Sequence, residues 1–416
     1  MGMRTPSENV SDERPRGKRR PKAVKNRNQG RRRQKGIRPV GTAAKASNHA
    51  RPSMDSGGAS NAATVENSVG MIKPEVRGLS GYPAPPQGEM IAKLNQNENP
   101  YDLPPEMKDE ILESMRSLEW TRYPIFDPPA LRRKLSARFG LSPDQILLGN
   151  GSNQLIYLLG SAIISPGDSV MVAPPTFSLF DLVGRIAYGR IVAVDQNPDF
   201  TLDEDRVIRA IAGAKLSFLC SPNNPTGQVI PIPFLEKALK RAGGLVVWDE
   251  AYGEFWGETA VPLLARHPNL LILKTFSKAF GLAGLRIGYM MAHSALITEL
   301  RKVNIPFNIN LMSLLVAMKL LEHPGWTAEQ VRKIVEERNR LSAAMKAVPG
   351  ITVYPSATNF ILMKTRDGGA VFNGLKALGI LVRPTEPHPL LRDCLRVTVG
   401  TPNENEAFLA ALRKVA

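Results

Sequence analysis

Residues 270–289 read LLILKTFSKAFGLAGLRIGY. An apolar run of strand length, residues 270–273, leads into a polar turn that contains Ser277 and Lys278, and Arg286 follows eight residues later. A lysine amine is a poor nucleophile while it is protonated, but desolvation and a neighbouring cation lower its pKa and free its lone pair for a Schiff base with an aldehyde. Taken alone, the stretch fits equally well a solvated surface lysine or a strand that delivers a reactive amine into an anion-binding turn.

Strands and helices alternate on both sides of this stretch, from residue 123 to residue 304. Helical patterns or crossover-length gaps separate most of the predicted strands, as at residues 153–164 and 232–242. The predicted strands are residues 146–148, 170–172, 191–194, 216–220, 245–248, 270–273 and 286–291. This order is typical of an α/β protein with a mostly parallel sheet that helices cover on both faces, and ligands bind at the carboxyl ends of such strands.

The chain divides by composition into four segments. We expect a disordered basic tail over residues 1–75, an N-terminal arm over 76–125, a large domain over 126–305 and a smaller α+β domain over 306–416. The arm carries a predicted helix at 106–118 and is expected to join the small domain. In the small domain we expect helices near 310–322, 328–347, 371–378 and from 403, with strands near 353, 360, 380–382 and 395–399.

The net charge of +16 comes mainly from the tail. Residues 1–70 contain 16 Lys or Arg against 5 Asp or Glu and no Leu, Phe, Tyr or Trp, so they cannot form an apolar core. A ligand-sensing regulator whose tail binds DNA would need a helix-turn-helix, and no apolar periodicity supports one. We therefore expect no specific nucleic-acid partner. The role of the tail, and whether translation starts nearer Met71, stay open.

Other classes of site and location lack support in the sequence. The two cysteines and five histidines are scattered without metal-ligand spacing, so we expect no metal. No apolar run is long enough to span a bilayer, and no segment is typical of a signal peptide. We expect a cytoplasmic protein without a membrane partner.

Polar motifs follow three of the other predicted strands. Residues 149–153, Gly-Asn-Gly-Ser-Asn, open a helix whose free N–H groups suit a phosphate, although glycine turns before helices are common. Asn224 lies in a rigid turn after residue 220, where an Asx hydrogen bond is the simpler interpretation. Asp249 follows an apolar strand, and a buried carboxylate there calls for a cation, such as a protonated pyridine nitrogen.

The order and spacing of these motifs resemble those of pyridoxal-phosphate enzymes of the aspartate aminotransferase fold, over nearly everything after residue 76. Within that fold the chain is similar to the histidinol-phosphate aminotransferases, through LNQNENPY at 94–101, RYP at 122–124 and LRVTVGT at 395–401. The resemblance implies fold type I, with a mostly parallel seven-stranded sheet in the large domain and pyridoxal phosphate as cofactor.

The resemblance also assigns roles to residues. Lys278 would bind the cofactor covalently, Asp249 would pair with its ring nitrogen, and Asn224 and Tyr252 would contact its phenolic oxygen. Lys278, Asp249 and Tyr252 would form the catalytic set. The remaining assigned residues are Gly151, Ser152, Ser277 and Arg286 on the cofactor phosphate, Phe177 on the ring, Tyr123 on the phosphate of the other subunit, and Tyr82, Asn97, Arg383 and Arg396 on the substrate.

The implied activity is transamination of histidinol phosphate with 2-oxoglutarate in histidine biosynthesis, by a homodimer with shared active sites. Three positions differ from the common family pattern: Asn153-Gln154 replaces an acidic pair, Phe177 replaces tyrosine, and residues 384–389 lack a tyrosine-glycine pair. The last difference leaves open an aromatic amino-acid aminotransferase, which would use Arg396 for a carboxylate, or a threonine-phosphate decarboxylase.

Overall fold

The computed structural model describes residues 65–79, 81, 90–385 and 387–416. The chain divides into two compact units, Met1–Thr64 and Val65–Ala416, and the second is described below. The tail expected to be disordered covers residues 1–75. Residues 1–64 of it, and the role assigned to Tyr82, lie outside the described residues. Over residues 65–75 the expectation is wrong, because residues 65–70 are helical and a second short helix starts at Pro74. We propose that the N-terminal arm spans residues 76–125, the large domain residues 126–305 and the small domain residues 306–416.

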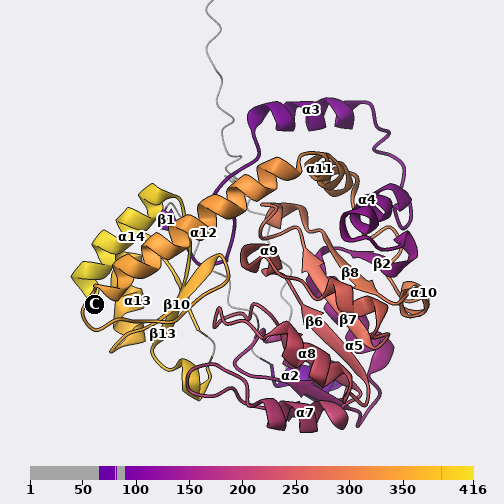
Figure 1. Cartoon of the computed structure of the whole chain (residues 1–416), viewed down its shortest axis with the longest axis horizontal. Helices are drawn as coiled ribbons and strands as arrows, with labels where there is room; N and C mark the ends of the chain where they lie inside the picture. Colours follow the sequence, from indigo (N-terminus) through magenta and orange to yellow (C-terminus); the bar gives the residue numbers. More distant parts are fainter. Residues whose placement is uncertain (1–64, 80, 82–89, 386) are drawn as a thin grey trace, which may run out of the picture. The chain divides into compact units, whose positions relative to one another are not determined.

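A seven-stranded sheet forms the core of the large part of the second unit (Figure 1). Its strands in chain order are β2 (Ile146–Gly149), β3 (Ser169–Val172), β4 (Arg190–Ala193), β5 (Leu216–Cys220), β6 (Leu245–Asp249), β7 (Leu270–Thr275) and β8 (Gly288–Ala292). They lie in the order β2-β8-β7-β6-β5-β3-β4, and only β8 runs antiparallel to its neighbours. The expected mostly parallel seven-stranded sheet is confirmed.

Helices cover both faces of this sheet because successive side chains of each strand point to opposite faces. Leu147 and Val247 pack against one layer of helices, whereas Leu148 and Trp248 belong to the core on the other side. The first layer contains α5 (Gly151–Ile163), α6 (Leu179–Ile186) and α10 (Ser294–Arg301). The second contains α4 (Pro129–Phe139), α7 (Glu204–Ala212), α8 (Ile232–Leu239) and α9 (Gly253–Trp256).

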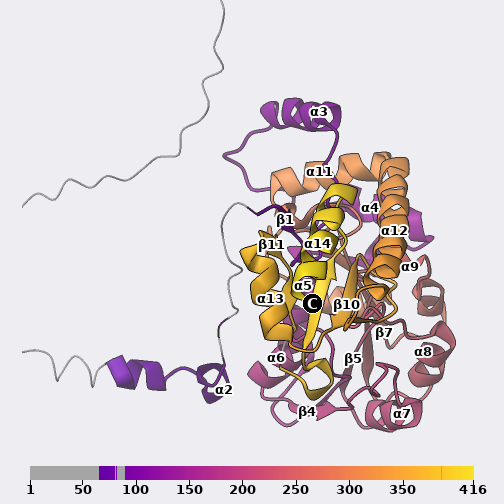
Figure 2. The same cartoon turned by 90° about the vertical axis from the view of Figure 1, so that its left-hand side faces the viewer.

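The C-terminal part forms a smaller α+β part that lies beside the large sheet in Figure 1 and faces the viewer in Figure 2. Its antiparallel sheet has the order β12-β13-β10-β9, with β9 (Thr352–Val353), β10 (Phe360–Lys364), β12 (Arg383–Pro384) and β13 (Cys394–Thr398). The helices here are α11 (Leu311–Glu322), α12 (Pro324–Lys346), α13 (Gly368–Ala377) and α14 (Pro402–Val415). Single 3₁₀ turns lie at η1 (Pro143–Gln145), η2 (Val261–Ala265), η3 (Ala283–Leu285) and η4 (Pro389–Leu391).

The N-terminal arm joins this smaller part, as expected. Strand β1 (Ala92–Lys93) pairs in parallel with β11 (Ile380–Leu381). After β1 the arm contains α3 (Pro105–Arg116). Before β1, α2 (Pro74–Arg77) spans the expected boundary between tail and arm, and Lys73, just ahead of α2, donates to the Ile186 carbonyl at 2.9 Å.

One predicted strand starts later than expected. We expected a strand from Arg286, but β8 begins at Gly288 because Arg286 has φ +51°, a left-handed conformation that interrupts extended backbone. The displaced residue belongs to the candidate site described below.

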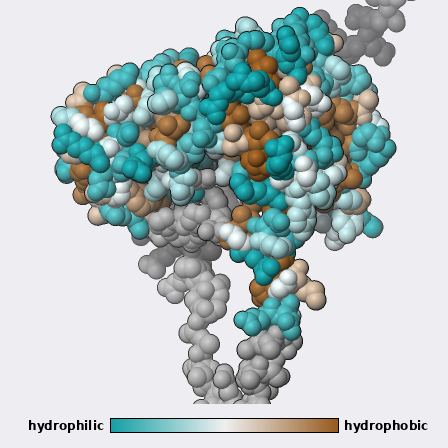
Figure 3. Space-filling view, turned by 90° about the horizontal axis from the view of Figure 1, so that it is seen from below, coloured by the Kyte–Doolittle hydropathy of each residue, from teal (hydrophilic) through white to brown (hydrophobic). Residues whose placement is uncertain are grey.

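Among the described residues, no helix is both long and apolar enough to cross a membrane. On the face shown in Figure 3, hydrophilic residues predominate and hydrophobic ones lie in small groups between them.

Candidate active site

A cavity of about 640 Å³ lies at the carboxyl ends of the large sheet's parallel strands, against β12 and β13 of the smaller part. Most of the residues assigned from the sequence line it, although they come from segments up to 300 positions apart. They are Asn97, Ser152, Phe177, Asn224, Asp249, Tyr252, Ser277, Lys278, Arg286, Arg383 and Arg396. The fold therefore brings the scattered motifs to one place.

Lys278 follows β7, and its amine faces this cavity. The Nζ atom donates to the Gln96 carbonyl at 3.0 Å and lies 5.9 Å from the centre of the Tyr252 ring. Desolvation, and then the positive charge of Arg396, lower the pKa of Lys278 to about 7. An amine with this pKa is substantially unprotonated near neutral pH and can act as a nucleophile or a base.

Asp249 ends β6 and is almost fully buried. Its Oδ1 accepts from the Ala251 N–H at 2.8 Å, and burial raises the pKa of its carboxyl to about 6. Among the described residues no lysine, arginine or histidine pairs with it within 4 Å. A cation bound in the cavity would stabilise its charged form, which is what a protonated ring nitrogen supplies.

The Tyr252 hydroxyl is held by the N-terminal arm. Asn97 Nδ2 donates to the Tyr252 Oη at 2.8 Å, and Thr398 Oγ1 donates to Asn97 Oδ1 at 3.3 Å. Burial raises the pKa of Tyr252 to about 12, so its hydroxyl stays protonated and can donate. Both polar atoms of the Asn97 side chain thus have partners within the protein. Its contact with the substrate remains a prediction.

Asn224 and Arg396 form a second polar pair in the cavity. Arg396 Nη1 donates to Asn224 Oδ1 at 2.5 Å, and Nη2 donates to the Asn95 carbonyl at 3.1 Å. Arg383 lies directly opposite Arg396 across the β12–β13 pair, and opposite residues in an antiparallel pair share a face. Both arginines consequently line the cavity, which the sequence could not settle.

The start of α5 and the turn after β7 form a cradle for an anion. Arg286 Nη1 donates to Ser277 Oγ at 3.1 Å, and Thr275 Oγ1 donates to the same oxygen at 3.0 Å. Gly151 has φ +75°, and a Cβ there would collide with Arg286 Nη2. Free N–H groups at the helix start, a hydroxyl and a guanidinium fit a phosphate ester, so the residues present fit the cofactor that the resemblance implies.

Two of the assigned aromatic residues occupy different environments. Phe177 lines the cavity and meets Phe180 edge to face, with ring centres 5.6 Å apart. Tyr123 lies outside this cavity, with 81% of its surface exposed, and stacks on Phe307 at 4.7 Å. Its assigned contact would require a second subunit.

Several groups at the site were missed from the sequence. The carbonyls of Asn95 and Gln96 accept from Arg396 and Lys278, and backbone acceptors of this kind leave no signal in residue type. Lys274 directly follows the predicted strand 270–273, and the structure extends that strand, β7, through it to Thr275, next to the site. Among the described residues, no group of three His, Cys, Asp or Glu side chains could hold a metal ion.

Comparison with known proteins places this geometry in context. The family model described as aminotransferase class I and II matches residues 89–412. A histidinol-phosphate aminotransferase of Chlorobaculum tepidum is 36% identical over 83% of this chain and 100% of its own length, and histidinol-phosphate aminotransferase 2 of Bordetella parapertussis is 39% identical over 86% and 99%. The histidinol-phosphate aminotransferase of Sinorhizobium meliloti, solved with pyridoxal-5′-phosphate, superposes with a TM-score of 0.74 at 25% identity, over 83% of this chain and 97% of that one.

Proposed function

This chain belongs to the class I and II aminotransferase family, and from that premise we propose that it transfers an amino group between histidinol phosphate and 2-oxoglutarate, a step of histidine biosynthesis. The observation that carries the proposal is the amine of Lys278, with its pKa near 7, in one cavity with the buried Asp249 and a phosphate cradle. The cofactor is pyridoxal phosphate.

Different residues of the cavity would bind different parts of this cofactor. Lys278 would supply the amine for covalent attachment and Asp249 the negative charge for the ring nitrogen. The cradle of Gly151, Ser152, Ser277 and Arg286 would hold the phosphate. When bound, pyridoxal phosphate supplies a protonated aromatic ring that withdraws electrons from the carbon bearing the substrate's amino group. Phe177 would lie against one face of that ring, and Asn224 and Tyr252 near its phenolic oxygen.

Lys278 then acts as the base of the reaction. Its neutral Nζ would take the proton from the substrate carbon that bears the amino group, and the resulting ammonium would later give a proton back. The charge of Asp249 keeps the ring nitrogen protonated during this transfer. Asp249 is almost fully buried, whereas Lys278 stays partly exposed to the cavity in which the substrate would bind.

Arg383 and Arg396 are the groups that suit a phosphorylated substrate. Histidinol phosphate carries a phosphate and no α-carboxylate, and two guanidinium groups side by side can bind a dianion through several charge-assisted hydrogen bonds. We assign Tyr82 and Asn97 to the same substrate.

We also propose a homodimer in which Tyr123 reaches the cofactor phosphate of the other subunit. Its exposure, and its stack on Phe307 outside its own cavity, support that assignment. A cytoplasmic location is supported by Cys220 and Cys394, which are both buried free thiols and suit a reducing compartment.

The decisive experiment is a half-reaction. The purified protein loaded with pyridoxal phosphate would be mixed separately with histidinol phosphate, phenylalanine and threonine phosphate while the visible absorbance of the cofactor is followed. We expect rapid loss of that absorbance with histidinol phosphate, and imidazole-acetol phosphate as product. A preference for phenylalanine, or release of CO₂ from threonine phosphate, would keep the cofactor but overturn the substrate.

A further inference from the structure

A buried charge lies on β7 four residues before Lys278. The side chain of Lys274 is 4% exposed, and its ammonium pairs with Glu250 at 3.2 Å and with Glu254 at 2.9 Å. Its Nζ lies 5.8 Å from the centre of the Phe139 ring, and Tyr289, its fully buried partner on β8, closes another side. None of the roles assigned above uses this Lys274 cluster (Lys274, Glu250 and Glu254).

Three hydrogen bonds, in addition to the ion pair with Lys274, hold the Glu250 carboxylate in place. Its Oε1 accepts from Trp248 Nε1 at 3.1 Å and from the Ala260 N–H at 2.6 Å, while its Oε2 accepts from Thr259 Oγ1 at 2.7 Å. A buried carboxylate with this many donors cannot reorient without leaving donors unsatisfied. Lys274 is therefore bound to a rigid anchor.

The cluster continues the pairing of β6 and β7 at the point where the two strands separate. The last pair in register is Asp249 with Leu273, and the Glu250 N–H still donates to the Leu273 carbonyl at 2.9 Å. The Glu250–Lys274 ion pair lies one residue further along both strands. Beyond this ion pair, the segment after β6 leads into α9, and the segment after β7 leads to Lys278.

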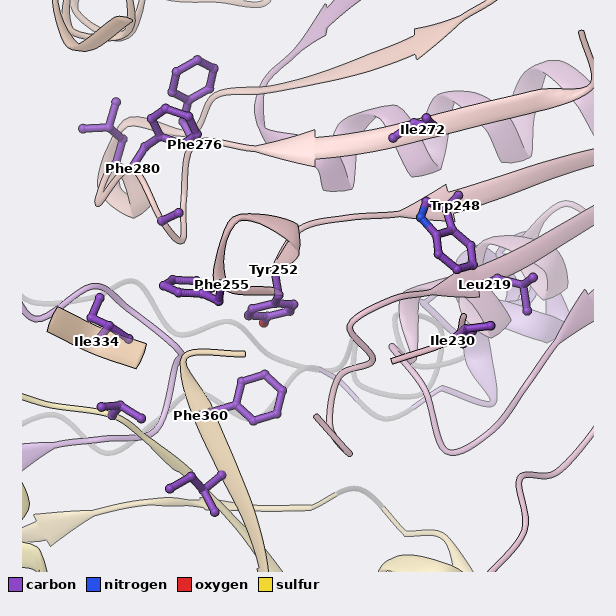
Figure 4. Packing of buried hydrophobic residues seen from close by; sticks show 14 of the residues in the cluster. Leu219, Ile230, Trp248, Tyr252, Phe255, Ile272, Phe276, Phe280, Ile334 and Phe360 are labelled. Carbon is purple, nitrogen blue, oxygen red and sulfur yellow. The ribbon is translucent and has the colours of Figure 1, made fainter. Parts of the chain in front are cut away.

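The cluster and the cofactor groups share one backbone. Asp249 lines the cavity while the next residue, Glu250, pairs with Lys274, because successive residues of a strand face opposite sides. Tyr252 lies in the turn beyond Trp248 and faces Phe360 of β10 at 5.2 Å (Figure 4). The cluster thus fixes the two segments that carry Asp249 and Lys278 relative to each other.

We propose that Lys274, through its ion pairs with Glu250 and Glu254, is a positioning residue that sets the spacing between Asp249 and Lys278. The inference rests on the proposed cofactor, because a rigid ring held at its nitrogen by one group and at its aldehyde by the other tolerates little change in that spacing. Loss of the cluster should weaken cofactor binding as well as turnover.

The test compares four variants. Lys274→Met removes the ammonium but leaves two buried carboxylates, so it risks misfolding. Lys274→Met with Glu254→Gln removes one charge of each sign and leaves Glu250 with its three other donors. Lys274→Arg keeps the ion pairs, and Lys237→Met, whose amine pairs with Glu204 at 3.6 Å on the surface, is the matched control.

Each cofactor-free variant would be checked for cooperative unfolding and titrated with pyridoxal phosphate. We expect the double variant to fold and its dissociation constant for the cofactor to rise about tenfold or more, with a lower kcat. The Lys274→Arg and Lys237→Met variants should stay within about twofold of the unmodified protein. A folded double variant with an unchanged dissociation constant would overturn the inference, whereas an unmodified protein that binds no pyridoxal phosphate would overturn the proposed function itself.

Discussion

The chemistry at the residue scale depends on two groups whose pKa values move in opposite senses from their usual ranges. Desolvation lowers the pKa of Lys278 to about 7 and raises that of Asp249 to about 6, because in each case burial disfavours the charged form. The amine gains reactivity from this environment. The carboxyl becomes dependent on a cation that the cofactor ring would supply.

Lys278 should make the stability of the cofactor-free protein depend on pH. Between pH of about 7 and about 10 the unfolded chain carries a proton on this lysine and the folded chain does not, so stability from this group rises with pH. From about pH 7 to about pH 9 we expect a gain of roughly 1 kcal/mol, because partial exposure to the cavity reduces the full effect. Denaturant unfolding at both pH values measures it.

The Lys278→Met variant is the reference for that measurement. It lacks the titrating amine but keeps the side chain's length, so the other ionisable groups cancel in the comparison. The gain should disappear in the variant. Equal pH dependence in both proteins would mean that Lys278 is protonated as readily in the folded chain as in the unfolded one.

At the element scale, the site consists of strand ends and one helix start. Asp249 and Lys278 follow neighbouring parallel strands, and the start of α5 faces the turn after β7. No acidic side chain lies in the first turn of α5. The partial positive charge at the N-terminus of α5 can therefore stabilise a bound anion. Gly151 lets Arg286 approach this end.

Gly151→Ala should therefore damage the cradle. The new Cβ would need φ +75° and would displace Arg286, so we expect the affinity for pyridoxal phosphate to fall by about tenfold to 100-fold, equivalent to losing one charge-assisted hydrogen bond. Titration of the cofactor-free protein gives the value.

Gly140→Ala separates backbone strain from loss of the cradle. Gly140 ends α4 with φ +67°, and a Cβ there would meet nothing within 4 Å. This control should lose about 1 kcal/mol of stability yet bind the cofactor normally. If both variants bound pyridoxal phosphate equally well, Gly151 would have no part in the phosphate site.

At the scale of the whole molecule, the proposed active unit contains two chains. Tyr123 lies outside its own cavity. Phe307, on which it stacks, and Phe126, which meets Phe307 edge to face, are 42% and 47% exposed. Exposed apolar side chains gathered near each other are typical of surfaces that another protein covers. A second copy would cover them and would bring Tyr123 to the other site.

Mixed dimers test this arrangement. A Lys278→Ala chain should be inactive and a Tyr123→Ala chain weak, but a dimer of one with the other contains one site with Lys278 from the second chain and Tyr123 from the first. We expect that hybrid to recover close to half the activity of the unmodified dimer. Activity no higher than the average of the two parent variants would place each site within a single chain.

Much of this protein follows from local sequence. The alternation of apolar runs with helical patterns predicted all seven strands of the large sheet, because backbone pairing and side-chain period are local properties. Residue types at the strand ends indicated Asn224, Asp249 and Lys278, since polar side chains after buried strands of a parallel sheet meet at one edge.

The tertiary structure decided what depends on distant partners. The register of β12 with β13 places Arg383 opposite Arg396, and the arm brings Asn97 to Tyr252 and the Gln96 carbonyl to Lys278. These contacts join residues more than 150 positions apart or depend on strand pairing, so no local pattern encodes them. The pKa values follow the same rule, because desolvation is a property of the assembled core and not of the residue.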